Sequence, residues 1–551
     1  MDGVPTVWTQ TPGSLHAGLI LRVGSADETL TTSGVTHALE HLALFGVARP
    51  GDHANAFVDQ SMTMFHVNGS VEQVVDFFDK VTRQLAAPPL DRLADELGIL
   101  RTEEANQKGA VEQALLAWRY GAQGYGLPAQ DALGLHRLDG PAVLAWSARF
   151  ATRANAALWL SGPPPAGLRL SLPDGRFQPP PDPRAGILPN HPCWFTGPRD
   201  GAALHTVVTR DSSASALAHI LSGRLVDELR VKRAAAYSPC ADYKPLTGTI
   251  ARLLAVTDLV EGRESEAVRP FLRSLERLAD PGGEGAVTPD DVAEWQARAA
   301  QHDDEPRVAA GLAYDSAFQL AFGEPARDVG QMLAERAAIT AEDVTNRARE
   351  AFANVLACVP PGMGTVLPPW SEAPVTQLGP LTGAEHRSLD YPEVTDRLIV
   401  ASTGITRRGS GTTQVTVPVA ATAAVLRWDD GRRVLVGTDA NRIDIEPTLW
   451  YDGRKVVEHI DQTWPADLTV DLGSREESSI PTPRTTGTIR PDRVRRWLKP
   501  ELIIPIPLLI LVVVLAITHP HLSGAAGRSL VIFGLSTCVA SYWNARHGRH
   551  E

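Results

Sequence analysis

The chain has 551 residues, of which 43% are hydrophobic and 21% are charged. These proportions exclude a wholly disordered or fibrous protein, and the length allows three or four domains. Acidic residues outnumber basic ones by 64 to 52, which gives a net charge of −12. A surplus of negative charge argues against non-specific binding to phosphate backbones, so nucleic acid is not an expected partner.

The four cysteines lie far apart and form no C-x-x-C pair. This spacing suggests neither a disulfide framework nor a thiolate zinc site, and it fits a reducing compartment. The N-terminus lacks a basic segment followed by an apolar core, so nothing there resembles a secretory signal. We therefore expect residues up to about 490 to remain in the cytoplasm.

Two blocks of similar size come first along the chain, at 1–175 and 193–365, and a proline-rich linker at 176–192 separates them. Each block mixes apolar, strand-like runs with amphipathic helix patterns. We therefore predict an α+β fold for both.

A helix is predicted over residues 32–46, TSGVTHALEHLALFG. Thr32 or Ser33 is available to cap its start, and Gly46 is suited to end it.

His37, Glu40 and His41 are at positions i, i+3 and i+4 of this helix, so their side chains share one face. Two imidazoles at that spacing can bind one zinc ion, and the carboxylate between them can act on a water at the open coordination position. This order of residues is the inverted H-x-x-E-H zinc motif. The alternative interpretation is an ordinary solvated helix face.

Catalytic zinc usually takes three protein ligands, and a second predicted helix at 90–104 offers a third. Glu96 and Glu103 are seven residues apart and fall on the same face of that helix. We predict that Glu103 is a ligand of one zinc ion per chain and that Glu96 supports a ligand by hydrogen bonding. Without the zinc motif, such a pair would indicate only a solvated face.

After a linker at 366–394, short β-rich runs between turn signals predict a small β domain at 395–465. Its pattern is similar to the pleckstrin-homology-like (PH-like) modules attached to bacterial membrane proteins. A β-barrel spacer is the alternative. A second linker at 466–500 ends in a basic juxtamembrane segment.

Residues 501–545 contain two uncharged apolar runs, Leu502–Thr518 and Ser529–Trp543, which predict a transmembrane helical hairpin. Arginines and a lysine flank the pair on both sides, so the positive-inside rule places both flanks, and the preceding domains, in the cytoplasm. High alanine, arginine and proline usage is typical of bacteria with GC-rich genomes, so the membrane is expected to be a bacterial cell membrane. A buried helical pair in a soluble domain is the alternative.

In these motifs the chain resembles the M16 family of zinc metallopeptidases, the group of pitrilysin, insulin-degrading enzyme and mitochondrial processing peptidase. His37, His41 and Glu103 match the zinc ligands of the family, and Glu40 matches its general base. Glu96 occupies the place of an additional helix glutamate that the family has seven residues before the last ligand.

Two further segments resemble substrate-binding motifs of the same family. Asn55 and Phe57, in ANAF, match an Asn-Ala-aromatic strand whose edge holds an extended peptide. Arg230 and Tyr237, in LRVKRAAAYS, match the family's Leu-Arg…Gly-Leu-Ala-Tyr-Ser signature. The resemblance implies that they reach across to bind the substrate backbone and support the tetrahedral intermediate.

The chain departs from the family pattern at two places. First, Ala234-Ala235 replaces the Gly-Leu of the signature. Second, only 61 residues lie between His41 and Glu103, fewer than is usual in the family, because material is missing between Phe45 and Asn55. Substrate contacts there are expected to be reduced.

The resemblance covers about residues 1–365 and implies two α+β half-domains that form one half of a clamshell. A homodimer or an M16-like partner subunit would complete the chamber. No G-x-x-x-x-G-K-[ST] phosphate loop is present, so the expected substrates are peptides or unfolded segments. The alternative function is a catalytically silent scaffold or assembly subunit that binds peptides or partners at the membrane.

Overall fold

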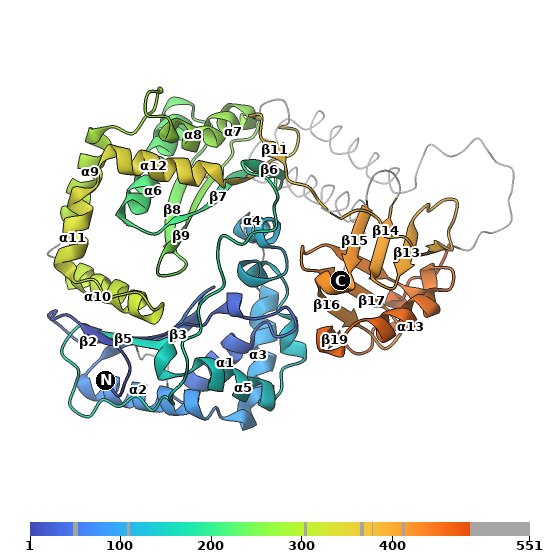
Figure 1. Cartoon of the computed structure of the whole chain (residues 1–551), viewed down its shortest axis with the longest axis horizontal. Coiled ribbons are helices and arrows are strands. Elements are labelled where there is room, and N and C mark those ends of the chain that lie inside the picture. The colour runs from blue at the N-terminus through green and yellow to red at the C-terminus, as the bar shows by residue number, and fades with distance from the viewer. Residues whose placement is uncertain are drawn as a thin grey trace, which may run out of the picture. The chain divides into compact units, whose positions relative to one another are not determined.

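The computed structural model describes residues 1–47, 53–106, 111–301, 306–363, 368–376, 378–409 and 414–484. Met1–Pro483 forms one compact unit (Figure 1). Within the described residues, no helix has both the length and the apolar character needed to span a bilayer. The predicted transmembrane hairpin at 501–545 and the basic segment before it lie outside the described residues.

The first block is a five-stranded sheet with helices. The sheet has the strand order β1-β5-β2-β4-β3, which leaves β3 at an edge. Its strands are β1 (Thr6–Trp8), β2 (Leu15–Leu21), β3 (Ala54–Val58), β4 (Thr63–Gly69) and β5 (Ala156–Leu160). Its helices are α1 (Val35–Leu44), α2 (Val71–Ala86), α3 (Leu93–Asn106), α4 (Val111–Tyr120) and α5 (Gly140–Phe150).

The second block repeats this topology. Its sheet has the order β11-β6-β10-β7-β9-β8. The part β6-β10-β7-β9-β8 repeats the order β1-β5-β2-β4-β3 of the first sheet, with each strand number raised by five. The strands are β6 (Cys193–Thr196), β7 (Gly201–Thr209), β8 (Cys240–Pro245), β9 (Ile250–Asp258), β10 (Leu356–Val359) and β11 (Ser371–Glu372). The helices are α6 (Ser212–Leu225), a π-helical turn η6 (Val226–Lys232), α7 (Glu264–Leu272), α8 (Ser274–Ala279), α9 (Pro289–Ala300), α10 (Pro306–Ala321), α11 (Val329–Ala338) and α12 (Ala341–Ala353).

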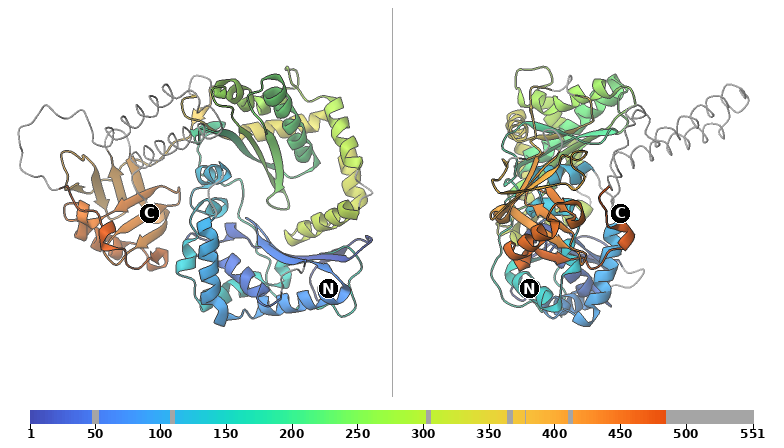
Figure 2. Two further views of the ribbon diagram at one scale, coloured as in Figure 1. Left: turned by 180° about the vertical axis from the view of Figure 1, so that it is seen from behind. Right: turned by 90° about the vertical axis from the view of Figure 1, so that its right-hand side faces the viewer.

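Each block also packs one helix against the other block's sheet (Figures 1 and 2). Helix α10 places Phe318 in an apolar cluster with Ile20 of the first sheet. Helix α4 places Leu115 in a cluster with Leu356 of the second sheet. The guanidinium of Arg119, which is buried at the end of α4, donates hydrogen bonds to backbone carbonyls of the second block. The two blocks are therefore tied together by reciprocal burial of apolar surface.

The third part of the chain contains two four-stranded sheets, β12-β13-β14-β15 and β18-β17-β16-β19. The strands are β12 (Ala384–Arg387), β13 (Arg397–Ala401), β14 (Gly404–Arg408), β15 (Gln414–Pro418), β16 (Thr422–Arg427), β17 (Arg433–Gly437), β18 (Arg442–Ile445) and β19 (Thr469–Asp471). Helix α13 (Gly453–Thr463) packs Val456 and Ile460 into the core between them. The likeness to PH-like modules stays a prediction.

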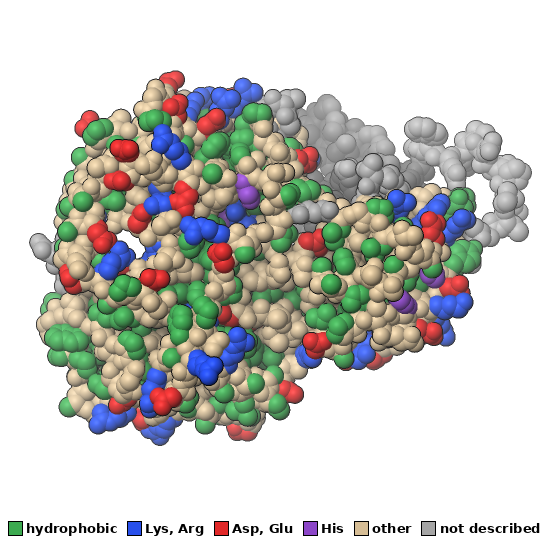
Figure 3. All heavy atoms as spheres, viewed as in Figure 1, with side chains coloured by type: hydrophobic (Ala, Val, Ile, Leu, Met, Phe, Trp, Pro, Cys, Tyr) green, Lys and Arg blue, Asp and Glu red, His purple; other side chains and the backbone are tan. Residues whose placement is uncertain are grey.

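The predicted limits of this β domain, 395–465, were too narrow. Strand β12 falls in the predicted linker 366–394 and β19 falls in the predicted linker 466–500, yet both pair with strands of this domain. Strand β11 also falls in 366–394, but it pairs with β6 of the second block. The side chains of β12 are largely exposed, so this short edge strand carries little apolar alternation and is specified mainly by backbone pairing. Strand β19 has only three residues, of which Val470 is buried. On the face shown in Figure 3, basic and acidic side chains are interspersed over all three parts.

The reciprocal packing predicts a stability effect at α10. Replacing the buried Phe318 with Ala should lower the free energy of unfolding by about 3–5 kcal/mol, because it removes an aromatic side chain from the cluster that joins α10 to the first sheet. Urea unfolding of the full chain, followed by tryptophan fluorescence, measures the change. Val329→Ala on the exposed side of α11 is the control and should change stability by less than about 0.5 kcal/mol. Equal midpoints for both variants would contradict the packing.

Candidate metal centre

Helix α1 begins differently from the sequence-based prediction. Neither Thr32 nor Ser33 caps it; the N-cap is Gly34, which has a left-handed φ of 90° and no side chain to offer. Instead, the two carboxylate oxygens of Glu28 accept the backbone N–H groups of Gly34 and Thr36, each at 2.8 Å. The first N–H groups of any helix lack partners within it, so this buried carboxylate replaces the usual cap.

Glu28 is 7% exposed, and burial raises the pKa of its carboxyl to about 7, while the hydrogen bonds from the start of α1 act in the opposite direction. Sequence reasoning missed this residue, because hydroxyl side chains adjacent to the helix were the more obvious caps.

The three motif residues of α1 lie together on one face, as their spacing predicts. Glu40 Oε2 is 3.6 Å from His37 Nε2 and 3.9 Å from His41 Nε2. One ligand atom from each of the three residues lies within 4.8 Å of the others, which makes them a candidate metal group. Glu40 is buried, whereas both imidazoles are partly accessible.

Helix α3 adds Glu103 to this group. Its Oε2 lies 3.8 Å from His37 Nε2 and 3.8 Å from His41 Nε2. Tetrahedral zinc with bonds of about 2.0–2.1 Å holds its ligand atoms about 3.3 Å apart, so shifts of a few tenths of an ångström would close the set. Two imidazoles and one carboxylate are also donors that suit zinc. The residues present therefore fit a divalent metal.

Glu96 lies seven residues, or about two helical turns, before Glu103 on α3, and it contacts the other ring nitrogen of His41. Its Oε2 is 3.1 Å from His41 Nδ1. A carboxylate beside Nδ1 favours the tautomer in which Nδ1 carries the proton and Nε2 keeps a lone pair for a metal. The same carboxylate also fixes the orientation of the ring. The structure thus places Glu96 where it can orient a ligand.

Electrostatics prepare these groups for metal binding and proton transfer. Burial, together with the neighbouring His41, lowers the pKa of His37 to about 4, so this imidazole is neutral near pH 7 and keeps a lone pair for a metal. Burial raises the pKa of Glu40 to about 7, with His41 acting in the opposite direction and the Glu103 carboxylate adding to the rise. A carboxylate with a pKa near neutrality is suited to act as a general base.

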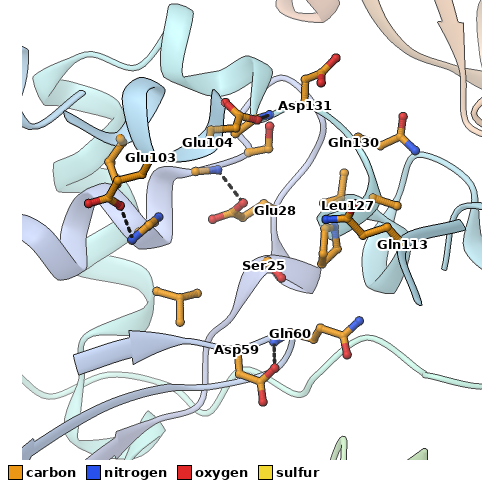
Figure 4. Close-up of a pocket in the computed structure, with 18 of the residues that line it drawn as sticks. Ser25, Glu28, Asp59, Gln60, Glu103, Glu104, Gln113, Leu127, Gln130 and Asp131 are labelled. Carbon is orange, nitrogen blue, oxygen red and sulfur yellow. Dashed lines mark hydrogen bonds and ion pairs between the residues drawn. The ribbon is translucent and has the colours of Figure 1, made fainter. Parts of the chain in front are cut away.

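The group opens into a cavity of about 710 Å³ that His37, Glu40 and Glu103 help to line (Figure 4). Asp59 follows the edge strand β3 on the cavity wall, and Lys244 from β8 of the second block forms an ion pair with it at 2.6 Å. Both blocks therefore contribute to the cavity.

The predicted substrate contacts are placed unequally. Phe57 lines the cavity and is 40% exposed, whereas Asn55, on the same strand, is exposed but is not among the lining residues. Arg230 and Tyr237 do not line the cavity either. They contact each other, with the Arg230 guanidinium 5.0 Å from the centre of the Tyr237 ring, and Tyr237 is 71% exposed. The structure places Phe57, but not these two, on the wall of the cavity that the metal group also lines.

The loop before Tyr237 contains a strained residue. Ala234 has φ 47°, in the left-handed region, at the position where the family signature has glycine. The backbone shape that a glycine would adopt freely is thus retained with an alanine.

Comparisons with known proteins give the fold. No family model and no curated protein matches the sequence. Among solved structures, the peptidase M16 inactive domain from Pseudomonas fluorescens has a TM-score of 0.52 at 13% identity, over 68% of this chain and 96% of that one. A protease from Helicobacter pylori has a TM-score of 0.53 at 16% identity, over 65% of this chain and 97% of that one.

A chain of complex III2 from Candida albicans has a TM-score of 0.52 at 13% identity, over 67% of this chain and 96% of that one. At these identities the likeness shows the fold alone. The chain thus has the mixed α/β fold of M16 half-domains, a fold that also occurs in an inactive domain, so activity has to be argued from the residues themselves.

The capping role of Glu28 can be tested directly. Glu28→Ala should lower the free energy of unfolding by about 1–2 kcal/mol and weaken zinc binding, because it leaves the N–H groups at the start of the metal-binding helix unpaired. Urea unfolding and a competition titration with a chromophoric chelator give the two quantities. Thr32→Ala is the matched control and should have little effect on either. If Thr32→Ala had a larger effect than Glu28→Ala, Thr32 rather than Glu28 would be the residue that caps α1.

The strain at Ala234 predicts a stabilising substitution. Ala234→Gly should raise the free energy of unfolding by about 1 kcal/mol, since glycine adopts a left-handed φ without steric cost. The control is Ala235→Gly, at a buried neighbour without positive φ, which should lower stability. Urea unfolding distinguishes the two, and a destabilised Ala234→Gly variant would argue against the left-handed conformation.

Proposed function

We propose that the chain is a zinc-dependent endopeptidase that cleaves peptides or unfolded segments at the cytoplasmic face of a bacterial membrane. The observation that carries this proposal is the convergence of His37, His41 and Glu103 around the buried Glu40 at the wall of a cavity. An ordinary solvated helix face would not bring a glutamate from a second helix to 3.8 Å from both imidazoles.

The residues of the chain divide the work of peptide hydrolysis. His37, His41 and Glu103 would hold the zinc ion, and Glu96 would keep His41 in the correct tautomer. When bound, zinc supplies a Lewis acid that activates a water molecule and polarises the scissile carbonyl. Glu40 takes a proton from the attacking water and later delivers it to the leaving amine, a task that suits a carboxyl with a pKa of about 7.

The edge position of β3 supports an extended substrate. One side of β3 pairs with β4, and the other side has no strand partner among the described residues, so a peptide can add to it as a further strand. Phe57 would contact the peptide in the cavity, and Asn55 would do so farther along the strand. Arg230, on the π-helical turn η6, and Tyr237, on the loop after it, would bind the substrate backbone from the second block, for which their exposure leaves room.

Location and partners belong to the same proposal. The hairpin at 501–545 would anchor the chain in the membrane, and a homodimer or an M16-like partner subunit would complete the chamber. The cavity of about 710 Å³ is of the size that holds small ligands or a short piece of peptide, which supports unfolded rather than folded substrates.

A second candidate function is a catalytically silent scaffold or assembly subunit. The similarity to an M16 domain described as inactive favours it, because that domain shows that the fold can persist without activity. The similarity to a chain of complex III2 shows the same fold within a multi-protein complex. Retention of all three metal-binding residues and the base argues for the peptidase.

Hydrolysis of a mixed library of unstructured peptides, read by mass spectrometry, tests the proposal. The purified full chain with zinc should cut, and Glu40→Gln should lower the rate by about 10²–10⁴-fold while zinc binding is retained, since only the base is lost. Glu103→Gln should instead lose zinc. Glu294→Gln, at an exposed position of α9, is the control and should behave like the parent. Absence of cutting by a zinc-loaded parent would favour the scaffold.

A further inference from the structure

The sheet formed by β16, β17 and β19 in the β domain has two apolar faces. Val425 and Leu435 point into the core of the β domain itself. Their neighbours along the strands belong to a different cluster, on the opposite face, and all are 6% exposed or less. That outer cluster contains Ala424, Leu426, Val434, Val436 and Val470. An independent module with a free surface would carry polar side chains there.

The first block covers this outer face. We call residues 121–138 the wall segment. Its side chains Ala122, Leu127 and Leu133 complete the outer cluster, together with Leu30 from earlier in the first block. The wall segment contains the short helical turns η3 (Gly124–Ala129) and η4 (Leu133–His136). Both sides of the contact are therefore apolar and shielded from water, which makes their separation unfavourable.

Polar contacts fix the register of the same junction. The Ala122 N–H donates to the carbonyl oxygen of Thr438 at 2.9 Å. The Arg442 guanidinium lies 3.3 Å from the Gln130 side-chain oxygen. The Arg137 guanidinium donates to backbone carbonyls beside β19. These bonds join the wall segment to the β domain at both of its ends and in its middle.

The opposite side of the wall segment faces the metal centre. Residues 127–132 and Leu135 line the cavity. The Gly134 N–H lies 3.3 Å from Ser33 Oγ at the start of α1, and the Arg101 side chain of α3 donates to the Leu135 carbonyl at 2.8 Å. Glu104, the neighbour of Glu103, accepts the Ala132 N–H. The segment thus contacts both helices that carry the metal-binding residues.

We propose that the β domain is a positioning element of the active site: its outer face holds the wall segment in the conformation that shapes the substrate cavity. This inference rests on the proposed peptidase function for its effect on catalysis, but the packing role is a property of the chain alone. The β domain is then a structural part of the peptidase half rather than a detachable spacer or address.

Truncation is a poor test, because it would expose the apolar face of the wall segment. Leu426→Ala combined with Val434→Ala instead loosens the contact in the full chain while leaving Val425 and Leu435 to hold the core of the β domain. Tyr451→Ala, which removes a 56% exposed side chain from the same domain, is the control. Hydrogen–deuterium exchange, zinc content and peptide hydrolysis are measured on all three proteins.

The double variant should exchange amide hydrogens in residues 121–138 about tenfold faster or more, with α2 and α5 protected as in the parent. Zinc content and kcat should stay near parental values, whereas KM should rise several-fold, because the wall segment lines the proposed substrate cavity and supplies none of the metal-binding residues. Should the double variant fail to fold, Arg442→Ala removes the contacts of this guanidinium with Gln130 and Asp131 and should give a smaller change in the same direction.

Unchanged exchange in the wall segment of a folded double variant would overturn the proposal. So would faster exchange without a change in KM, since the cavity would then be indifferent to the β domain. If the parent cuts no peptide, the peptidase function fails, while the exchange result still supports or overturns the packing role.

Discussion

The site depends on one packing constraint, which is that α1 and α3 must lie against each other with their apolar faces in the core and their polar faces toward one point. Leu39 and Leu42 of α1 and Leu97 and Leu100 of α3 are buried in the same cluster. A helix has 3.6 residues per turn, so fixing these leucines also fixes the direction of the intervening histidines and glutamates. The metal group is therefore as rigid as the core beneath it.

The structural repeat shows how the two blocks differ at the position of the candidate metal group. Helix α6 occupies the place of α1 in the second block, but its sequence SSASALAHILSGRL contains no glutamate and only one histidine. Most of its other side chains are small or aliphatic and are buried. The second block instead supplies α10, which covers the first sheet, and Lys244, which pairs with Asp59 at the cavity. The same fold thus carries the candidate metal group in one block and supports it in the other.

Sequence reasoning located the metal group because helical periodicity is a local property. His37, Glu40 and His41 had to share a face once a helix formed, and Glu103 followed from its spacing to Glu96 on a second helix. The cap supplied by Glu28 could not be found in this way, because it depends on a turn that folds back six residues upstream of Gly34. The positions of Arg230 and Tyr237 relative to the cavity depend on how the blocks pack, which no local pattern encodes.

The β domain shows a signal that the sequence did contain. The runs TAAVLR and RVLVG are almost continuously apolar, whereas a strand with one solvated face alternates with a period of two. Such runs require partners on both faces, and a small domain has only one core of its own. The second face had to be buried by another part of the chain, and the wall segment provides the leucines for it. Because that segment also borders the metal-binding helices, the two-faced sheet connects a domain without catalytic residues to the geometry of the site.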